Sequence, residues 1–390
     1  MNRVIVTDTQ YRMALAPMRT LARAGWAVTA AAFETTVPGA RLGFFSRDAR
    51  DTLLLPEDGE GFCAALEAAA GDDRPVLLCG NRKSMILAMA NRARLERRLE
   101  LLLPSAAAMA AADDKGRMYQ TALRLGVPAP QTTCLSEHGS LDALERAVRY
   151  PCIIKYRNGE ALGLKPAARY AVVRSRPAFL EAYARMDRLD PDPIASDYIA
   201  GHDLGAAVVM DKACRPVGVL CYESLREYPL AGGPTCALRT VWSPRLAQYA
   251  CALLQEIGFT GLAMLDFRGT PEQPWFLEIN PRVWGSAMIA PLSGSPLFLR
   301  YAEAARGTAA PLEPDRLEPD YQVGRQMRFT PQSLACFAAL MKRPGRGAAL
   351  AASLKSTLDP RVRDGLFTWR DPLPYLHYLH YLADLLRRRA

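Results

Sequence analysis

Short apolar runs alternate with stretches of helical spacing along the first 110 residues. Runs at residues 4–7, 26–33 and 75–79 predict strands, because each is short and bounded by glycine or polar residues. Residues 13–24 and 62–70 carry apolar side chains three and four positions apart, which is the spacing of an amphipathic helix. A strand–helix–strand series predicts an α/β domain with a parallel sheet and crossover helices.

After a break at residues 103–105, the pattern predicts two further parts and a C-terminal extension. A turn-rich connector at residues 190–193, with two Asp-Pro pairs, separates the two parts. One predicted helix ends at residue 125, and three more span residues 141–148, 179–186 and 246–257. The predicted strands span residues 151–155, 171–173, 194–199, 204–210 and 216–222.

Two more strands with a turn between them are predicted at residues 261–267 and 276–280. The turn falls at residues 269–274, which include a glycine and two prolines. Asp266 and Glu278 are equally distant from residue 272, in the middle of this turn. A hairpin would therefore place them opposite each other, with their Cβ atoms about 5 Å apart.

The end of the second strand carries side chains that suit a divalent cation. Side chains two positions apart on a strand share a face, so Glu278 and Asn280 point to the same side. The carboxylates of Asp266 and Glu278 would repel each other unless a cation lay between them. With Arg282 just beyond, the pattern favours a hard cation that bridges phosphates. The structural alternative is a hairpin with polar residues on its wet face.

Composition narrows the class of protein. Half of the 390 residues are hydrophobic, enough for sizeable cores, yet no apolar stretch approaches the roughly 20 residues of a membrane span. Nine cysteines, an odd number without a C-x-x-C pair, indicate a reduced cytosol rather than disulfides or structural zinc. The chain begins with a predicted strand and shows no signal-peptide core, so we expect a cytoplasmic protein.

Several common functional motifs are absent. The first strand is not followed by G-x-G-x-x-G, and neither G-x-x-x-x-G-K-[ST] nor G-x-S-x-G occurs, which excludes the usual dinucleotide, P-loop and nucleophile-elbow sites. Basic residues are not interleaved with aromatic ones across the body of the chain, so we expect no nucleic-acid partner.

Other residues, in order along the chain, resemble the ATP-grasp superfamily, and most closely its carboxylate–amine ligases related to carbamoyl-phosphate synthase and D-alanine–D-alanine ligase. The residues that carry the resemblance are Asp114-Lys115, residues 151–155, residues 197–203, residues 232–235, Asp266 and residues 278–282. The resemblance covers roughly residues 1–310. It implies a pre-ATP-grasp α/β domain at 1–110 and an α+β ATP-grasp part with a small lobe at 111–193 and a large lobe at 194–310. The remaining residues, 311–390, are predicted to form a basic helical extension.

The resemblance assigns the phosphates of ATP to two lysines. Lys115 and Lys155 match the family's phosphate-binding positions, and lysine is a compact cation for phosphate oxygens. Lys155 also ends an apolar strand, where an ammonium group is costly without an anion. Residues 158–165 match the family's loop that covers the phosphates. As single residues, both lysines are more often surface charges.

The resemblance also implies the adenosine site. Asp197, Tyr198 and Ile199 match the strand whose backbone groups meet the adenine edge, which needs one donor and one acceptor. Asp203 matches the acid that holds the ribose hydroxyls, where many members have the longer glutamate.

Asp266, Glu278 and Asn280 match the family's ligands for Mg²⁺, with Mn²⁺ as an alternative ion. Arg282 matches the arginine that contacts the transferred phosphoryl group. Arg239 follows the glycine-containing segment 232–235, which matches a substrate-facing loop, and would hold a carboxylate. A glycine turn before a strand is the structural alternative.

The implied activity is an ATP-dependent carboxylate–amine ligase that acts on small molecules such as amino acids through an acyl phosphate. One departure argues against a specific D-alanine–D-alanine ligase, because Met264 stands where those enzymes have an arginine. A carboxylate–thiol ligase, a phosphotransferase and a non-catalytic ATP-binding scaffold are the alternatives.

The C-terminal tail carries much of the positive charge. Residues 341–390 hold ten lysines and arginines and four aspartates, so they contribute six of the nine net positive charges. A helix with a wide apolar face is predicted from Asp371 to about Arg389, with Asp371 suited to its N-terminus. The helix would dock on its own domain or on a second subunit of a homodimer. An interfacial membrane helix, an anionic partner and a solvated basic end are the alternatives.

Overall fold

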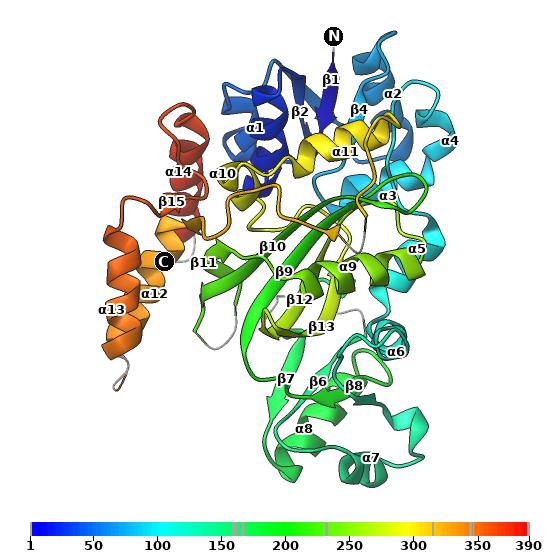
Figure 1. Cartoon of the computed structure of the whole chain (residues 1–390), viewed down its shortest axis with the longest axis vertical. Helices are drawn as coiled ribbons and strands as arrows, with labels where there is room; N and C mark the ends of the chain where they lie inside the picture. Colours follow the sequence, from blue (N-terminus) through cyan, green and yellow to red (C-terminus); the bar gives the residue numbers. More distant parts are fainter. Residues whose placement is uncertain are drawn as a thin grey trace.

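Three β-sheets organise the residues that the computed structural model describes, namely 2–157, 162–164, 168–230, 233–313, 316–342, 345 and 347–387. The N-terminal sheet, the large sheet and the small sheet follow one another from top to bottom of the molecule (Figure 1). This arrangement confirms the predicted mixed α/β class.

The N-terminal sheet is parallel, with strand order β3-β2-β1-β4. Its strands are β1 (Arg3–Val6), β2 (Ala27–Phe33), β3 (Asp51–Leu55) and β4 (Val76–Leu78), and its helices are α1 (Leu15–Arg23), α2 (Gly59–Ala70), α3 (Arg82–Ala90) and α4 (Arg92–Leu95). The hydrophobic pattern predicted every strand except β3. This edge strand exposes most of its length to solvent and begins with Asp51 and Thr52, so its apolar run is limited to the three leucines 53–55.

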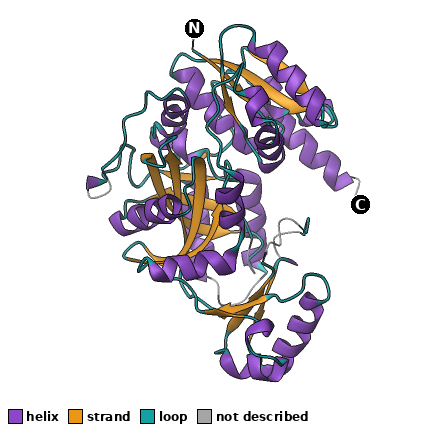
Figure 2. Ribbon diagram, turned by 90° about the vertical axis from the view of Figure 1, so that its right-hand side faces the viewer, coloured by secondary structure: helices purple, strands orange, loops and turns teal. Residues whose placement is uncertain are grey.

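The small sheet has strand order β5-β8-β6-β7 and is antiparallel. Its elements are β5 (Thr132–Thr133), β6 (Cys152–Lys155), β7 (Tyr170–Val173) and β8 (Ile194–Asp197), with helices α7 (Leu141–Ala147) and α8 (Arg176–Asp187) on one face. Figure 2 shows this unit projecting from the rest of the molecule. Because β8 pairs with β6, the small sheet continues past residue 193, where the sequence placed a boundary.

The large sheet has strand order β13-β12-β9-β10-β11-β14-β15. Its strands are β9 (His202–Met210), β10 (Pro216–Glu227), β11 (Thr235–Thr240), β12 (Gly261–Thr270), β13 (Gln273–Asn280), β14 (Gln326–Arg328) and β15 (Arg363–Asp364). Helix α9 (Pro244–Glu256) packs on one face, where Leu246 and Leu254 are fully buried. The helices α5 (Ala106–Asp113) and α6 (Lys115–Arg124) lie beside β13.

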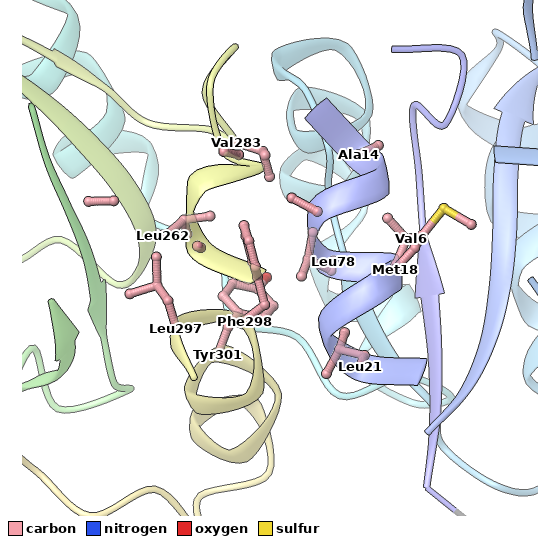
Figure 3. Close-up of a cluster of buried hydrophobic side chains, with 14 of the residues drawn as sticks. Val6, Ala14, Met18, Leu21, Leu78, Leu262, Val283, Leu297, Phe298 and Tyr301 are labelled. Carbon is pink, nitrogen blue, oxygen red and sulfur yellow. The ribbon is translucent and has the colours of Figure 1, made fainter. Parts of the chain in front are cut away.

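A continuous core joins the other face of the large sheet to the N-terminal domain. Helices α10 (Ile289–Ser293) and α11 (Leu297–Ala305) pack between the sheet and α1, and Figure 3 shows Phe298 and Tyr301 directed toward Leu78 and Leu21. The buried Tyr301 hydroxyl donates to the Leu77 carbonyl at 3.2 Å and approaches the Leu102 carbonyl at 3.0 Å. This core fixes the N-terminal domain against the sheet that carries the candidate site.

The C-terminal extension is only partly separate. It holds helices α12 (Thr330–Met341), α13 (Gly347–Leu358) and α14 (Leu373–Arg387), and its strands β14 and β15 extend the large sheet, which the sequence did not predict. Helix α14 docks on the N-terminal domain, where His377 stacks on Phe45 with ring centroids 3.4 Å apart. None of the described helices is long and apolar enough to cross a membrane.

Asp371 was predicted to interact with the dipole at the N-terminus of a helix, but in the structure it also has a buried charged partner. Its side chain is 2% exposed and forms an ion pair of 3.1 Å with Arg19, whose side chain is equally buried. Ser46 donates to the same carboxylate at 2.8 Å, and so does the Arg47 amide at 2.9 Å. Asp371 therefore ties the extension to the N-terminal domain.

Candidate active site

A cavity of about 630 Å³ lies between the small sheet and the large sheet, with Arg12 of the N-terminal domain in its wall. Its walls come from the N-terminal domain, from α6, from the small-sheet strands β6 and β7, and from β9–β13 of the large sheet. Most of the side chains predicted for ATP and metal binding line this one cavity. Its parts are named for their predicted ligands: the metal end around Asp266 and Glu278, the nucleotide end around Tyr198 and Asp203, and the substrate end around Tyr222 and Thr235.

The hairpin β12–β13 builds the metal end. Asp266 pairs with Glu278 and Met264 pairs with Asn280, as the symmetry of the turn predicted. A bulge between Asp266 and Phe267 shifts the rest of the register by one residue, so the turn tightens to Pro271 and Glu272. The Asn280 side chain donates from Nδ2 to Asp266 Oδ2 at 2.8 Å and lies 3.4 Å from Glu278 Oε1.

The two carboxylates differ in their affinity for protons. Burial and the nearby Glu278 charge raise the pKa of Asp266 well above its usual range. The positive charge of Lys115, whose Nζ lies 2.8 Å from Glu278 Oε2, lowers the pKa of Glu278 to about 2. Without a cation, the two neighbouring acids thus disfavour each other's ionised form.

Two lysines face these acids from the other lobe. Lys115 is the first residue of α6, and Lys155 is the last residue of β6. Burial, followed by the charge of Lys115, lowers the pKa of Lys155 to about 8. Lys155 Nζ donates to the Tyr119 hydroxyl at 3.2 Å. The arrangement favours an anion close to both ammonium groups.

Arg282 lies next to the metal end, and its charge lowers the pKa of Asp266. Its Nη1 lies 3.3 Å from the Val283 carbonyl. The predicted phosphate-covering loop at residues 158–165 falls mostly outside the described residues.

The nucleotide end contains part of the predicted adenosine site. Tyr198 and Asp203 line the cavity, and Asp203 accepts a hydrogen bond of 2.9 Å from Arg268. Asp197 and Ile199 are not among its described lining residues, and the Asp197 amide donates to the Gln131 carbonyl at 3.1 Å. The structure thus brings together one half of this predicted group.

Sequence reasoning missed Arg268 and Glu227 in the same region. Arg268 lies two positions after Asp266 on β12, so strand alternation was a signal for it. Glu227 ends β10 and lines the cavity. Burial and a hydrogen bond with Asp203 raise the pKa of Glu227 to about 8. No local motif marks Glu227, because only the folding of β10 beside β9 brings it there.

The substrate end is formed by aromatic and hydroxyl side chains. Tyr222 and Trp284 stack with ring centroids 6.2 Å apart, and the Thr235 hydroxyl donates to Ser224 at 3.1 Å. Gly205 makes room for this stack, because a Cβ atom there would lie 2.2 Å from Tyr222 Cζ.

The structure does not bring Arg239 into this cavity. Tyr222 and Ser224 line it, so the intervening Glu223 points to the opposite face of the sheet. Arg239 pairs with Glu223 across β10 and β11, and the two side chains form an ion pair. Gly233 and Thr235 do line the cavity, as predicted for the substrate loop, whereas Gly232 lies outside the described residues.

The known proteins that match this chain by sequence are D-alanine–D-alanine ligases. The chain is 27% identical over 188 residues to a D-alanine–D-alanine ligase of Ectopseudomonas mendocina and 26% identical over 180 residues to one of Chromohalobacter salexigens. The first match covers 46% of this chain and 57% of the ligase, and the second 43% and 54%. The chain thus spans about half the length of the curated relatives that it matches. No protein-family profile matches it.

Solved structures share the fold more widely. A biotin carboxylase from Campylobacter jejuni, in complex with β,γ-ATP, matches with a TM-score of 0.62 at 17% identity, over 83% of this chain and 74% of that one. A phosphoribosylglycinamide synthetase from Anaerococcus prevotii matches with a TM-score of 0.55 at 13% identity, over 83% and 79%.

All of these relatives belong to the ATP-grasp superfamily, which confirms the resemblance that the motifs predicted. The chain has the ATP-grasp fold, with its candidate site at the junction of the small and large sheets.

Proposed function

We propose that this protein is an ATP-dependent carboxylate–amine ligase that forms an amide or peptide bond through an acyl phosphate and releases ADP and phosphate. One observation carries the proposal. The opposed acids Asp266 and Glu278, with Asn280 beside them, face Lys115 and Lys155 in a single cavity. Opposed carboxylates and lysines suit a metal–triphosphate complex.

The residues present fit Mg²⁺. The described part of the chain holds no group of three His, Cys, Asp or Glu side chains that would enclose a metal by itself. Asp266, Glu278 and Asn280 instead offer two carboxylates and one amide, which leaves coordination positions for phosphate and water, as Mg²⁺ usually requires. Mn²⁺ has similar ligand preferences and is an alternative ion. The ion would neutralise phosphate charge when it is bound.

The residues also fit ATP. Lys155 is partly buried in the cavity, and desolvation together with the charge of Lys115 lowers its pKa, which favours a bound anion beside it. Lys115 is held 2.8 Å from Glu278, at the border between acids and cations. Both lysines would bind phosphate oxygens. Tyr198 and Asp203 would bind the adenosine part, with Arg268 orienting the Asp203 carboxylate.

The reaction requires the protein to position the substrates and to neutralise the phosphate charge, and it requires no nucleophilic side chain. A carboxylate becomes a good electrophile once it carries a phosphoryl group, because phosphate then leaves when an amine attacks. Lys115, Lys155 and Arg282 would stabilise the negative charge that develops on the phosphoryl oxygens. The cavity walls around Tyr222 and Trp284 would exclude water, which otherwise competes with the amine.

An ADP-release assay tests this function directly. Purified protein is supplied with Mg²⁺, ATP and pairs of amino acids and other small acids and amines, and products are identified by mass spectrometry. We expect ADP release that requires both an acid and an amine and yields an amide. A thioester or a stable phosphorylated product would instead indicate a carboxylate–thiol ligase or a phosphotransferase, and no acid-dependent ADP would contradict the proposal.

A further inference from the structure

Arg12 brings a positive charge from the N-terminal domain to the wall of the cavity. It begins the short helix Arg12–Ala14, which leads into α1. Its guanidinium lies over the ring of the buried Phe329, with Cζ 3.6 Å from the ring centroid. The Phe329 amide donates to the Cys236 carbonyl at 2.9 Å, next to Thr235 of the substrate end. Arg12 therefore lines the cavity at the same end as Thr235 and Ser224.

The guanidinium of Arg12 has an unused donor. Its Nη1 atom is buried and meets no hydrogen-bond acceptor among the described residues. A buried N–H group without an acceptor costs about 1–3 kcal/mol, and more when the group is charged. Such a group is expected where a ligand supplies the missing acceptor.

The charge of Asp364 compensates Arg12 only in part, because other groups occupy the Asp364 carboxylate. Asp364 Oδ1 accepts from the amides of Leu366 and Phe367, both at 2.7 Å. Asp364 Oδ2 accepts from the amide and the hydroxyl of Thr330, at 2.9 and 2.5 Å. The ion pairs of the described residues do not include Arg12. Burial lowers the pKa of Arg12, and a hydrogen bond with the Tyr378 hydroxyl and the charge of Asp364 offset this only in part. The Nη1 group of Arg12 thus remains available for an acceptor in the cavity.

Neither Met264 nor Arg239 supplies a positive charge at this end of the cavity. Met264, which lines the cavity, supplies no charge there, and Arg239 points to the other face of the sheet. Around Arg12, the wall offers the hydroxyl groups of Ser224 and Thr235. A guanidinium with adjacent hydroxyl donors matches a planar carboxylate better than it matches an amine or an apolar group.

We propose that Arg12 binds a free carboxylate of the substrate, distinct from the carboxylate that receives the phosphoryl group. This inference rests on the proposed ligase function. The substrate would span the cavity, with its reacting group near Asn280 and its free carboxylate at Arg12. That carboxylate belongs either to an amino acid that supplies the amine or to a dicarboxylic acid that is activated at its other end. Arg12 is thus a determinant of specificity.

Kinetics of full-length Arg12→Gln and Arg12→Lys test this role, with Arg98→Gln as control because Arg98 is an exposed arginine of the same domain. Each protein receives the active pair from the ADP-release screen, then the same pair with the free carboxylate of the amine donor, or of the acid, replaced by its carboxamide. We expect Arg12→Gln to raise KM for the carboxylate form by about 100-fold with kcat changed less than about threefold. Arg12→Lys should recover part of this loss.

The carboxamide arms separate recognition from a structural role. The KM of the carboxamide form should be nearly the same in Arg12→Gln and in the unaltered protein. If Arg12→Gln no longer distinguishes the carboxylate form of one substrate from its carboxamide form, that substrate is the one whose carboxylate binds Arg12. An equal loss for both forms, or an unchanged KM for the carboxylate form, would overturn the inference. Calorimetric titration of glycine, glycinamide, succinate and succinamate in the presence of MgADP makes the same comparison without turnover. Wild-type protein that releases no ADP but binds a carboxylate through Arg12 would reject the ligase function and keep the Arg12 site.

Discussion

Asp266 and Glu278 lie directly opposite each other on β12 and β13, and Asn280 bridges toward both from the end of the hairpin. This pairing concentrates two acids at one point, where burial and the charge of Glu278 raise the pKa of Asp266. A cation removes the conflict, which is why we regard this point as the metal end of the site.

Asp266→Asn separates the metal role from a structural one. The amide has the size of the acid and removes the repulsion from Glu278, so we expect stability without Mg²⁺ to be unchanged or higher. The stabilisation by MgATP should disappear, and kcat/KM should fall by about 100-fold or more. Thermal unfolding with and without MgATP measures both effects. Asp72→Asn, at a fully exposed acid, is the control. Normal stabilisation of Asp266→Asn by MgATP would exclude this residue as a ligand.

If Lys155 binds the phosphates, ATP binding should be accompanied by the uptake of a proton by the protein. In the free protein the pKa of Lys155 is about 8, whereas its ordinary value is 10.5. Phosphate oxygens beside the ammonium group favour the protonated form and raise that pKa. Calorimetry at pH 8.5 in two buffers of different ionisation heat should show proton uptake, and Lys155→Met should reduce it. Binding heats that are independent of the buffer would contradict the placement of Lys155 at the phosphates.

The lowered pKa of Lys155 also determines how the free energy of unfolding depends on pH. Between pH 8 and 10.5 the unfolded chain holds more protons on Lys155 than the folded one, so this residue makes folding more favourable as pH rises through that range. Below pH 8 its unfavourable contribution is constant. Urea unfolding of the nucleotide-free protein at pH 7.5 and 9.5 should therefore show a smaller pH dependence for Lys155→Met.

Gly205→Ala should disturb the substrate end without touching a charged group. The added methyl group would overlap the Tyr222 ring, which stacks on Trp284. We expect a loss of about 1–3 kcal/mol in the free energy of unfolding, together with a raised KM for the acid or the amine. Gly39→Ala is the matched control, since a Cβ atom at Gly39 meets nothing within 4 Å. Unchanged stability and kinetics of Gly205→Ala would show that the ring can move freely.

The buried ion pair between Arg19 and Asp371 should hold the C-terminal extension in place. Removing one partner leaves a buried charge alone, so Asp371→Asn or Arg19→Met should cost about 3–5 kcal/mol in urea unfolding. The double variant Arg19→Met/Asp371→Asn should cost less than the sum of the two single variants. Additive losses would mean that the two groups act independently.

The sequence predicted the pairing of Asp266 with Glu278 because its geometry is local. Asp266, Glu278 and Asn280 belong to one hairpin, so the position of the turn sets the register and strand alternation sets the faces. The one-residue bulge after Asp266 was not predictable, since either side of the turn can absorb an extra residue. The fold was predicted from the order of the ATP-grasp motifs along the chain.

The substrate end was harder because distant segments build it. Arg12 reaches the cavity only after the N-terminal domain packs on the large sheet, and it has no motif of its own. Arg239 looked suitable by its place after a glycine loop, but the register of β10 and β11 turns it to the other face. For Asp371 the helix start was predictable, whereas its buried partner Arg19 lies more than 300 residues away.

Isotope transfer from substrate to phosphate tests the central claim most directly. The acid of the active pair is labelled with ¹⁸O in its carboxylate and incubated with Mg²⁺, ATP and the amine. If the γ-phosphoryl group passes to that carboxylate and the amine then displaces phosphate, the released phosphate carries one ¹⁸O atom for each amide formed. We predict this label in full. Amide formation with unlabelled phosphate would contradict an acyl phosphate at the site of Asp266, Glu278 and Asn280.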